Sequence, residues 1–438
     1  MKTKTGMVFF MVLALALAAC GSESKPAESS ESVQEQSEPE SVAESEIESK
    51  PTADITETAE AAPPAEETET TLSTEETEPE TQAEKSIDEK AEQIIQQMSL
   101  EDKISQLFVV LPEALVPGVE CVTAAGPATE EAINEYPVGG IIYLLKNLQS
   151  EDQVVSMLKG AQDFSLARTG LPLFLCVDEE GGQVTRVAMS GITDAPEFDY
   201  MSEVGARGDV SEAEEIGASI GRYLGRLGFN VDFAPDADVL TNPENQVVKF
   251  RAFSSDPQVV ADMASAVSKG LRGEGVLSSY KHFPGHGNTS GDTHEGYAYT
   301  EKTLEELYEV ELVPFIKGIE EEVPFMMVGH ISLPNVTGSD IPASLSGVIV
   351  KDLLRDELGY EGIIITDALA MGAVAEQYSS GEAAVLALEA GNDMILMPVD
   401  FHAAYAGVLD AVNEGRISEE RIDESLMRII KTKLECVE

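Results

Sequence analysis

Residues 276–294 have the sequence VLSSYKHFPGHGNTSGDTH. The first five residues are apolar or small, as expected of a buried strand, and the rest is rich in Gly, Pro, Ser, Asn and Thr, which is typical of a loop. A polar loop that follows a buried strand is a common place for catalytic residues. Strands of this kind recur along the chain, and together they predict its fold.

Eight short runs are apolar throughout rather than alternating, which is typical of parallel strands buried on both faces. The runs are 107–110, 138–144, 173–177, 229–234, 276–280, 325–329, 362–366 and 393–397. Amphipathic stretches between them predict helices at 152–166, 210–227, 257–271, 304–319, 346–358, 381–390 and 403–413, and a last helix at 418–433 has Ser418 as its N-cap. This alternation predicts an α/β protein with a (β/α)8 barrel; an open parallel sheet of eight strands is the alternative.

Three of the five histidines lie within the thirteen residues 282–294. Histidine is the side chain best suited to proton transfer near neutral pH, and Asp292 is close enough in sequence to His294 to hydrogen-bond its imidazole. The density of polar groups favours a functional site over simple turn capping. A metal site formed by His282, His286 and His294 is the rival hypothesis. It is disfavoured because the spacing fits no familiar metal motif and Lys281 would repel a cation, so neither a metal nor another cofactor is expected.

Polar residues also follow the other predicted strands. They are Asp178 and Arg186 after the third strand, Asp236, Asp238, Lys249 and Arg251 after the fourth, Lys281 and His282 after the fifth, His330 after the sixth and Asp367 after the seventh. In a barrel the carboxyl ends of the strands meet at one rim, where catalytic residues gather. Each residue alone could cap a helix, but together they indicate a pocket for a molecule with many hydroxyl groups.

The N-terminus indicates export. Lys2 and Lys4 precede an apolar run at 8–19 that is too short for a stable membrane span, and the run ends at Cys20. The arrangement resembles a bacterial lipoprotein signal, in which the chain is cut before the cysteine and the cysteine then carries lipid. We therefore expect a signal peptide at 1–19 and an extracytoplasmic protein anchored to the membrane through Cys20. An ordinary secretory signal with an incidental cysteine is the alternative.

The segment 20–85 is acidic and has no aromatic residue, so it predicts a disordered linker that cannot bury enough apolar surface to fold. The catalytic domain is expected at 86–438. The formal net charge of the whole chain is −52, and much of the excess acid lies outside the linker. Because nucleic-acid binding requires basic surface, this charge excludes that class of partner. The charge is compatible with a neutral or amino-sugar substrate and leaves the oligomeric state open.

Cys121, Cys176 and Cys436 remain after Cys20. An odd number at irregular spacing indicates neither a disulfide framework nor a zinc site. Cys176 lies within an apolar run and is expected to behave as a small buried hydrophobic residue. The sequence does not decide whether Cys121 and Cys436 form a disulfide.

Several motifs resemble glycoside hydrolase family 3, and within it the β-N-acetylhexosaminidase branch. They are spread over the whole of 86–438. The matching segments are 98–103 (MSLEDK), 138–142 (VGGII), 178–186 (DEEGGQVTR), 281–287 (KHFPGHG), 291–294 (GDTH) and 365–369 (ITDAL).

The resemblance implies a role for each matching residue. Asp367 is expected to be the nucleophile that forms a glycosyl-enzyme, and His294 the general acid/base with Asp292 as its partner. The same resemblance implies that sugar hydroxyls are bound by Asp178, Arg186, Arg251, Lys281 and His282. Two positions depart from the family pattern. Glu179 stands where Gln is expected, which could place an extra charge beside Asp178, and Gln183 stands where Arg is expected.

The implied function is retaining, exo-acting hydrolysis of terminal β-linked N-acetylglucosamine from cell-wall or chitin-type glycans, with water or phosphate as the acceptor. A β-glucosidase of the same family is one alternative, although such enzymes typically carry a second domain that supplies the acid/base residue. A non-catalytic sugar-binding lipoprotein is the other alternative, but it would need no nucleophile.

Overall fold

A computed structural model describes residues 86–292, 296 and 298–436 of the chain. The predicted signal peptide, the linker with Cys20, and His294 lie outside these described residues.

Eight parallel strands form a nearly closed barrel, and each barrel strand pairs with the next barrel strand along the chain. The strands are β1 (Phe108–Val110), β2 (Gly140–Ile142), β3 (Phe174–Val177), β6 (Val231–Asp232), β7 (Leu277–Phe283), β9 (Phe325–Val328), β11 (Ile363–Thr366) and β12 (Ile395–Leu396). β12 pairs with β1, and a parallel bridge between Ile365 and Met394 joins it to β11. The prediction of a (β/α)8 barrel is confirmed, and the open sheet is wrong.

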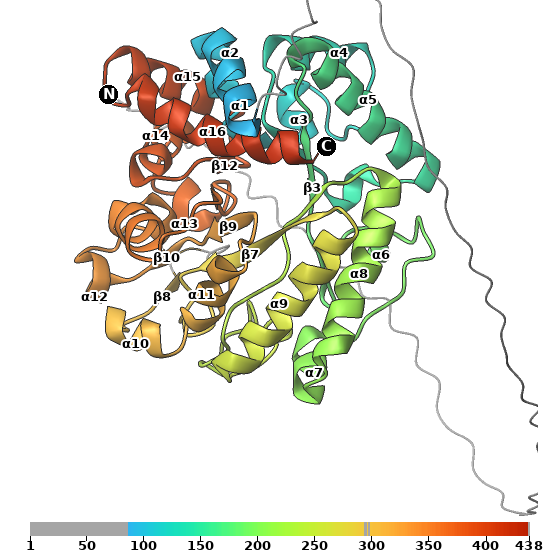
Figure 1. Cartoon of the computed structure of the whole chain (residues 1–438). Coiled ribbons are helices and arrows are strands. Elements are labelled where there is room, and N and C mark those ends of the chain that lie inside the picture. Colours follow the sequence, from blue (N-terminus) through green and yellow to red (C-terminus); the bar gives the residue numbers. More distant parts are fainter. Residues whose placement is uncertain (1–85, 293–295, 297, 437–438) are drawn as a thin grey trace, which may run out of the picture. The chain divides into compact units, whose positions relative to one another are not determined.

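Helices follow the strands on the outside of the barrel (Figure 1). Those predicted and found are α5 (Glu151–Thr169), α8 (Val210–Leu227), α9 (Pro257–Gly273), α14 (Ser380–Ala390), α15 (Phe401–Asn413) and α16 (Glu419–Glu435). Ser418 caps α16 as expected, because its side chain accepts a hydrogen bond from the Arg421 N–H. Helices α1 (Ile87–Gln97) and α4 (Pro127–Glu135) were not expected from the sequence.

Two predicted helices differ from the structure. The stretch 304–319 forms two helices, α10 (Leu304–Glu309) and α11 (Val313–Glu320), because Pro314 lacks an N–H and its ring would clash with the Val310 carbonyl in a continuous helix. The stretch 346–358 forms a wider π-helix, η3 (Val348–Glu357).

The fifth strand is longer than predicted. β7 continues to Phe283, so Lys281 and His282 project from a barrel strand and not from a loop. The physical reason is a backbone partner distant in sequence: Asp236 bridges Lys281, and the Ala237 N–H donates to the Lys281 carbonyl at 2.7 Å.

The segments that connect the barrel strands and outer helices contain shorter elements. They are α2 (Leu100–Ser105), α3 (Pro112–Leu115), η1 (Leu145–Asn147), β4 (Glu179–Gly181), β5 (Val184–Thr185), α6 (Val187–Ser190), α7 (Met201–Arg207), β8 (Ala298–Tyr299), β10 (Ile331–Ser332), α12 (Pro334–Thr337), η2 (Ala343–Leu345) and α13 (Gly372–Ala375). The hairpin of β4 and β5 follows β3 at its carboxyl end, and β8 pairs with β10. These additions build the rim on which the predicted site residues lie.

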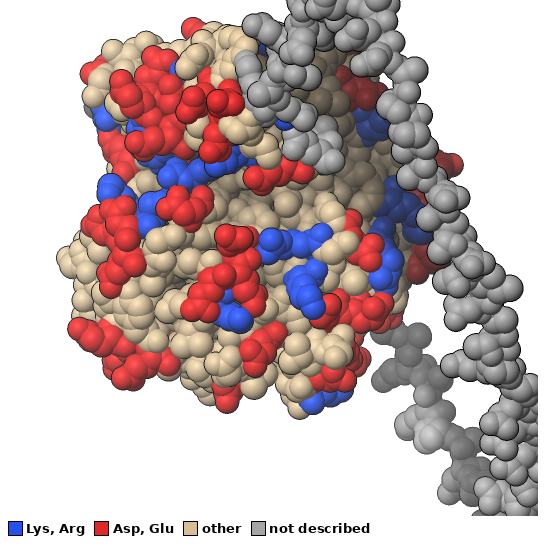
Figure 2. All heavy atoms as spheres, viewed as in Figure 1, with Lys and Arg blue, Asp and Glu red and all other residues tan. Residues whose placement is uncertain are grey.

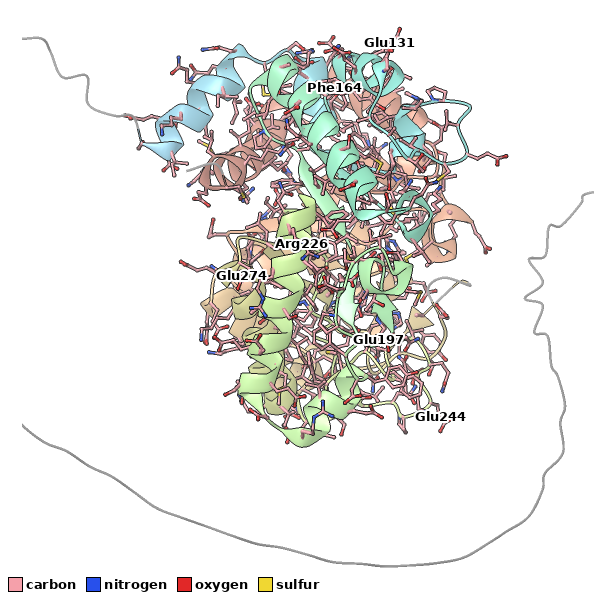
Figure 3. The ribbon with its side chains drawn as sticks, turned by 90° about the vertical axis from the view of Figure 1, so that its right-hand side faces the viewer. Glu131, Phe164, Glu197, Arg226, Glu244 and Glu274 are labelled. Carbon is pink, nitrogen blue, oxygen red and sulfur yellow. The ribbon has the colours of Figure 1, made fainter. Side chains whose placement is uncertain are left out.

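The helices around the barrel pack closely. A Cβ atom on Gly217 of α8 would lie 2.2 Å from the Val267 carbonyl oxygen of α9, and one on Gly270 would lie 2.2 Å from the Glu214 carbonyl oxygen. Only glycine permits this approach of the two backbones. Figure 3 views the side of the barrel where Phe164 marks α5 and Arg226 marks α8.

Acidic side chains are spread over the face shown in Figure 2, with smaller groups of Lys and Arg between them. Among the described residues no helix is both long enough and apolar enough to span a bilayer. Cys121, Cys176 and Cys436 are all free thiols, so the disulfide that the sequence left open is not formed, while Cys176 is buried as predicted.

A lysine of the last helix is buried without an acidic partner among the described residues. Lys433 of α16 is fully buried, and its Nζ donates to Gln106 Oε1 at 2.8 Å and lies 5.1 Å from the centre of the Phe174 ring. Within the described part of the chain it forms no ion pair. Burial lowers the pKa of Lys433 from 10.5 to about 7, because the charged amine loses its hydration inside the protein. The neighbouring Cys176 and Cys436 raise this pKa, but their effect is smaller.

We expect Lys433 to make the stability of the protein depend on pH. Between pH 7 and 10.5 the amine is largely neutral in the folded chain and protonated in the unfolded chain, so the unfolded state binds more protons and the free energy of unfolding rises with pH. From pH 7 to 10 the rise is on the order of 4 kcal/mol. Lys433→Met should abolish this part of the slope in chemical denaturation curves, whereas Lys431→Met on the same helix should keep it. Parallel curves for the wild type and Lys433→Met would contradict the assignment.

Candidate active site

A cavity of about 620 Å³ opens at the carboxyl ends of the barrel strands. It brings together every predicted catalytic and sugar-binding residue that the structure describes, namely Asp178, Arg186, Arg251, Lys281, His282, Asp292 and Asp367. These residues come from loops or strand ends separated by up to about 190 positions, so the barrel alone makes them neighbours. His294 lies outside the described residues.

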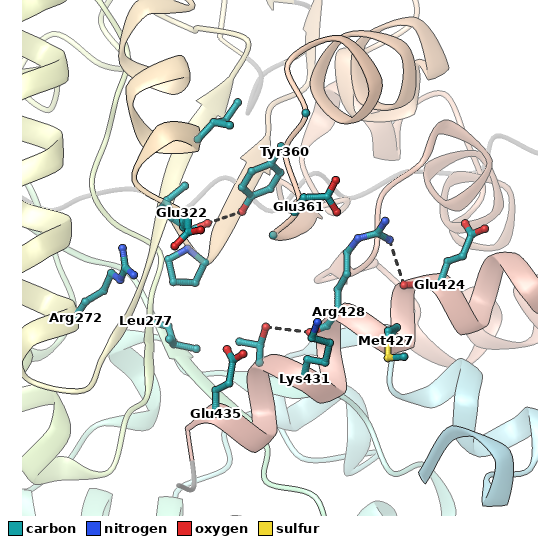
Figure 4. Close-up of a pocket in the computed structure, with 16 residues that line it drawn as sticks. Arg272, Leu277, Glu322, Tyr360, Glu361, Glu424, Met427, Arg428, Lys431 and Glu435 are labelled. Carbon is teal, nitrogen blue, oxygen red and sulfur yellow. Dashed lines mark hydrogen bonds between the residues drawn. The ribbon is translucent and has the colours of Figure 1, made fainter. Parts of the chain in front are cut away.

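A larger cavity, of about 830 Å³, lies at the opposite end of the barrel. Figure 4 shows Arg272 on one side of it and Arg428 and Lys431 of α16 on the other. Leu277 and Pro324, at the amino-terminal ends of β7 and β9, also line it. None of the predicted site residues lines this cavity, and in barrels of this kind chemistry takes place at the carboxyl ends of the strands. The smaller cavity is therefore the candidate site.

A buried ion network forms the floor of the candidate site. Lys281 Nζ lies 2.6 Å from Glu180 Oε1 and 2.9 Å from Asp178 Oδ1. Arg251 binds Glu180 in a bidentate manner, with Nε at 2.8 Å and Nη2 at 2.7 Å from its two carboxylate oxygens. Burial alone would raise the pKa of Glu180, but Arg251 and Lys281 outweigh it and hold that pKa far below its usual value. All three side chains are therefore charged near neutral pH.

His282 lies at the edge of this network. Its Nδ1 is 2.8 Å from Asp238 Oδ2, and its Nε2 is 3.3 Å from Arg251 Nη2. Burial, followed by the charge of Arg251, lowers the pKa of His282 to about 4, so the ring is neutral near pH 7. The neighbours select one tautomer, because Nδ1–H can donate to the carboxylate and the bare Nε2 can accept from the guanidinium. His282 is thus a fixed polar wall and not a proton carrier at neutral pH.

Three of these groups could approach a metal ion. Ligand atoms of Asp236, Asp238 and His282 lie within 4.8 Å of one another. However, Arg251 already occupies one side, 3.4 Å from Asp236 Oδ2 and 3.3 Å from His282 Nε2, and a cation there would meet its charge. His286, from the rival histidine set, is next to these groups but is not one of the three: its backbone N–H donates to Asp238 Oδ1 at 2.5 Å, and its ring Nδ1 lies 2.7 Å from Thr289 Oγ1.

Asp367 stands at the end of β11, beside the network. Its N–H donates to the Val328 carbonyl at 2.8 Å, and its Oδ1 accepts from the Ala368 N–H at 2.7 Å. Burial would raise the pKa of Asp367, but His282, His330, the Ala368 N–H and Lys281 together lower it. Because His282 is neutral near pH 7, His330, the Ala368 N–H and Lys281 are the remaining partners that lower the pKa of Asp367. Asp367 is therefore an ionised carboxylate with one oxygen restrained.

His330 fixes the peptide that follows Asp367. Its Nε2 donates to the Ala368 carbonyl at 2.9 Å, and its Nδ1 lies 2.7 Å from Ser344 Oγ. Since a carbonyl can only accept, the ring must carry a proton on Nε2. His330 thus restrains the backbone at Ala368 and acts on Asp367 through it.

Glu179 has a different place from the one its sequence position suggested. Its side chain is fully buried and does not line the cavity, so the expected extra charge beside Asp178 is not presented to a ligand. Instead it accepts the N–H groups of Arg186, Val187 and Ala188 at 2.5, 2.7 and 2.9 Å and the Tyr223 hydroxyl at 2.9 Å. Glu179 therefore anchors the turn that carries Arg186. Gln183, the other departure, does line the cavity.

The glycines of the histidine-rich segment serve close packing. A Cβ atom on Gly287 would lie 2.0 Å from the Val239 carbonyl oxygen, and Gly285 has a φ of +126° that L side chains rarely adopt. Asn245 Nδ2 binds the His286 carbonyl at 2.9 Å. The first part of the segment is therefore closely packed and hydrogen-bonded to the segment after β6.

Three residues that organise the site had no catalytic or sugar-binding role in the sequence-based prediction: Glu180, and Asp238 and His330, which were placed only in the general pocket. Glu180 lies within the motif 178–186, and Asp238 and His330 follow predicted strands. These positions in the sequence already indicated that the three residues lie near the site. Their partners, however, are distant in sequence and could not be read from it.

The site is typical of enzymes that bind polyhydroxylated substrates, and the comparisons with known proteins agree. The family model described as the glycosyl hydrolase family 3 N terminal domain matches residues 99–432. The chain therefore belongs to glycosyl hydrolase family 3, as its motifs predicted. It is 34% identical over 346 residues to the β-hexosaminidase LpqI of Mycobacterium tuberculosis, covering 77% of this chain and 83% of that protein.

Other relatives are longer than this chain. The β-hexosaminidase A of Pseudoalteromonas piscicida is 34% identical over 349 residues, which cover 73% of this chain and 58% of that protein. The solved structure of a glycoside hydrolase family 3 β-N-acetylglucosaminidase from Paenibacillus superposes with a TM-score of 0.72 at 36% identity, covering 78% of this chain and 64% of that one.

The anchoring role of Glu179 makes a prediction about stability. Glu179→Ala leaves three backbone donors without their acceptor, and we expect the free energy of unfolding to fall by on the order of 3 kcal/mol. Tyr223→Phe is the matched control, because it removes only one of the four hydrogen bonds and should cost about 1 kcal/mol. Hydrogen exchange should show faster exchange at the Val187 amide in Glu179→Ala alone. Equal exchange in both variants and the wild type would rule out the anchor.

Proposed function

We propose that the chain is an exo-acting β-N-acetylhexosaminidase that removes terminal β-linked N-acetylglucosamine with retention of configuration. The observation that carries the proposal is the ionised, restrained carboxylate of Asp367 in a cavity whose floor is the Glu180, Lys281 and Arg251 network. The names of the similar β-hexosaminidases and of the β-N-acetylglucosaminidase support the choice of substrate.

The first role of the site is to hold the terminal sugar. Lys281 and Arg186 present donors, and Asp178 presents a carboxylate that can accept from hydroxyl groups. His282 adds a neutral ring whose orientation is fixed by Asp238 and Arg251. Because Asp178, Lys281 and His282 are already paired before the substrate arrives, little reorganisation is needed to orient the anomeric carbon toward Asp367.

Cleavage then needs two groups. In the proposed mechanism Asp367 attacks the anomeric carbon and forms a glycosyl-enzyme, while His294 protonates the departing oxygen. His294 next takes a proton from the acceptor, which attacks the same carbon and releases the sugar. Asp292, which lines the cavity, would orient the His294 imidazole and stabilise its protonated form.

The direct test is release of nitrophenol from 4-nitrophenyl N-acetyl-β-glucosaminide, with the glucoside as a parallel substrate. The wild type should cleave the first and barely act on the second. Asp367→Asn keeps the size of the side chain but removes the nucleophile, so activity should fall at least about 1,000-fold with an unchanged melting temperature. Retention of more than about a tenth of the activity would exclude Asp367 as the nucleophile.

His294 can be tested through the leaving group. His294→Ala should lose roughly 100-fold or more on chitobiose, whose leaving sugar needs a proton, and far less on the activated 2,4-dinitrophenyl glycoside. Asp292→Ala should show the same pattern more weakly, and a chelator should leave the wild type unchanged. Equal losses on both substrates while glycosylation limits the rate, or inactivation by chelator with rescue by zinc, would refute the acid/base role.

We further propose that the natural substrate is a cell-wall or chitin-type glycan and that lipid on Cys20 anchors the enzyme to the outer side of a bacterial cell membrane. The lipoprotein-like sequence before Cys20 supports the anchor. Radiolabelled palmitate should label the wild type and not Cys20→Ala; labelling of both would refute it.

A further inference from the structure

Large apolar side chains are exposed mainly on one face of the described structure. Of eleven such residues, seven lie in segments that follow barrel strands, on the side where the candidate site opens. They are Val119, Leu145, Met189, Tyr200, Phe250, Tyr299 and Val399. The other four lie on the outer helices or η3. Exposed apolar side chains that lie together can mark a surface that another molecule covers, so the members of this group that contact one another are the ones of interest.

Tyr200 and Phe250 form a ring pair within this group. Their ring centres are 4.8 Å apart and their planes are inclined by 30°, yet Tyr200 is 43% and Phe250 39% exposed. The backbones are also joined, since the Ser202 N–H donates to the Phe250 carbonyl at 3.4 Å. The two rings therefore form one aromatic surface, held at a defined place and open to solvent.

The backbone that carries the ring pair adjoins residues that line the candidate site. Phe250 directly precedes Arg251, which lines the cavity, and consecutive Cα atoms are about 3.8 Å apart. A Cβ atom on Gly182 would lie 2.9 Å from the Cα atom of Tyr200, and Gly182 directly precedes Gln183, which also lines the cavity. Both rings thus rise from backbone next to cavity-lining residues, on two different loops.

We propose that the Tyr200–Phe250 pair is the binding platform for the sugar on the leaving-group side of the scissile bond. The proposal rests on the proposed function. The polar cavity binds the terminal sugar, so the remainder of an oligosaccharide must leave across the rim. The faces of a pyranose ring carry C–H groups that pack on aromatic rings, while its edges carry hydroxyl groups. Gln246, which is exposed and lines the cavity, offers a polar partner for such an edge.

This platform predicts a preference for oligosaccharides over small glycosides. Ring packing of this kind contributes only when a second sugar is present, because a methyl leaving group cannot reach the platform. The platform should therefore affect kcat/KM for long substrates and leave binding of the terminal sugar unchanged.

The test compares triacetylchitotriose with methyl N-acetyl-β-glucosaminide as substrates. The double variant Tyr200→Ala/Phe250→Ala should lower kcat/KM about tenfold on the trisaccharide and leave the methyl glycoside and inhibition by free N-acetylglucosamine unchanged. The double variant Tyr200→Phe/Phe250→Tyr keeps both rings and serves as the matched control, which should retain the wild-type preference. Melting temperatures identify any folding defect.

Two results would overturn the platform: an unchanged kcat/KM on the trisaccharide, or an equal loss on both substrates. If the rings instead face a membrane or a second copy of the chain, the alanine pair should reduce vesicle binding or dimer formation and spare the trisaccharide. If the wild type cleaves neither substrate, the proposed function fails by itself. Calorimetric binding of the trisaccharide to the wild type and the alanine pair then decides the platform separately.

Discussion

The site depends on the carboxylate of Glu180 and the two cations it binds. Glu180 comes from β4, Arg251 from the segment after β6, and Lys281 from β7, so a single carboxylate ties three neighbouring parts of the barrel rim together. Charges buried at this depth are costly unless they are paired and hydrogen-bonded, and loss of one partner leaves the others uncompensated. The network is therefore a constraint on geometry more than a source of stability. It holds Lys281 against Asp178 and Arg251 against His282.

The same network influences the protonation states of the titratable groups in the site. Arg251 and burial keep His282 neutral, so this histidine can shape the cavity but cannot supply a proton near pH 7. His330, the Ala368 N–H and Lys281 lower the pKa of Asp367 and keep it ionised, as the proposed nucleophile must be. The proton donor must then come from elsewhere, and the segment that carries Asp292 and His294 is the one that the resemblance assigns to it. An acid and a nucleophile can coexist in one site only where their environments move their pKa values apart, and for the carboxylate of Asp367 the neighbouring groups supply such an environment.

The sequence predicted the barrel well because each parallel strand is buried on both faces and leaves an apolar run that needs no knowledge of its neighbours. The sequence predicted that β7 ends before Lys281, but the strand continues to Phe283. It continues because Lys281 pairs with Asp236 in the segment after β6, a contact between residues distant in sequence. Glu179 and Glu180 show the limit most clearly. They are identical and adjacent in sequence, yet one anchors a turn behind the site and the other binds the cations on its floor. Alternation along a strand sends neighbours to opposite sides, but which side faces the cavity is set by the fold.

The rim and the floor obey different physical requirements. On the floor, hydrogen bonds and ion pairs are satisfied before a ligand arrives, so a hydroxyl-rich sugar exchanges its water for groups that are already oriented. At the rim, Tyr200 and Phe250 leave apolar area exposed, and that area is stabilised only when something covers it. Recognition of a neutral glycan requires both, because hydroxyl edges need fixed polar partners and ring faces need apolar ones. The strong negative charge of the chain does not oppose this, since a neutral sugar has no net charge for the acidic surface to repel.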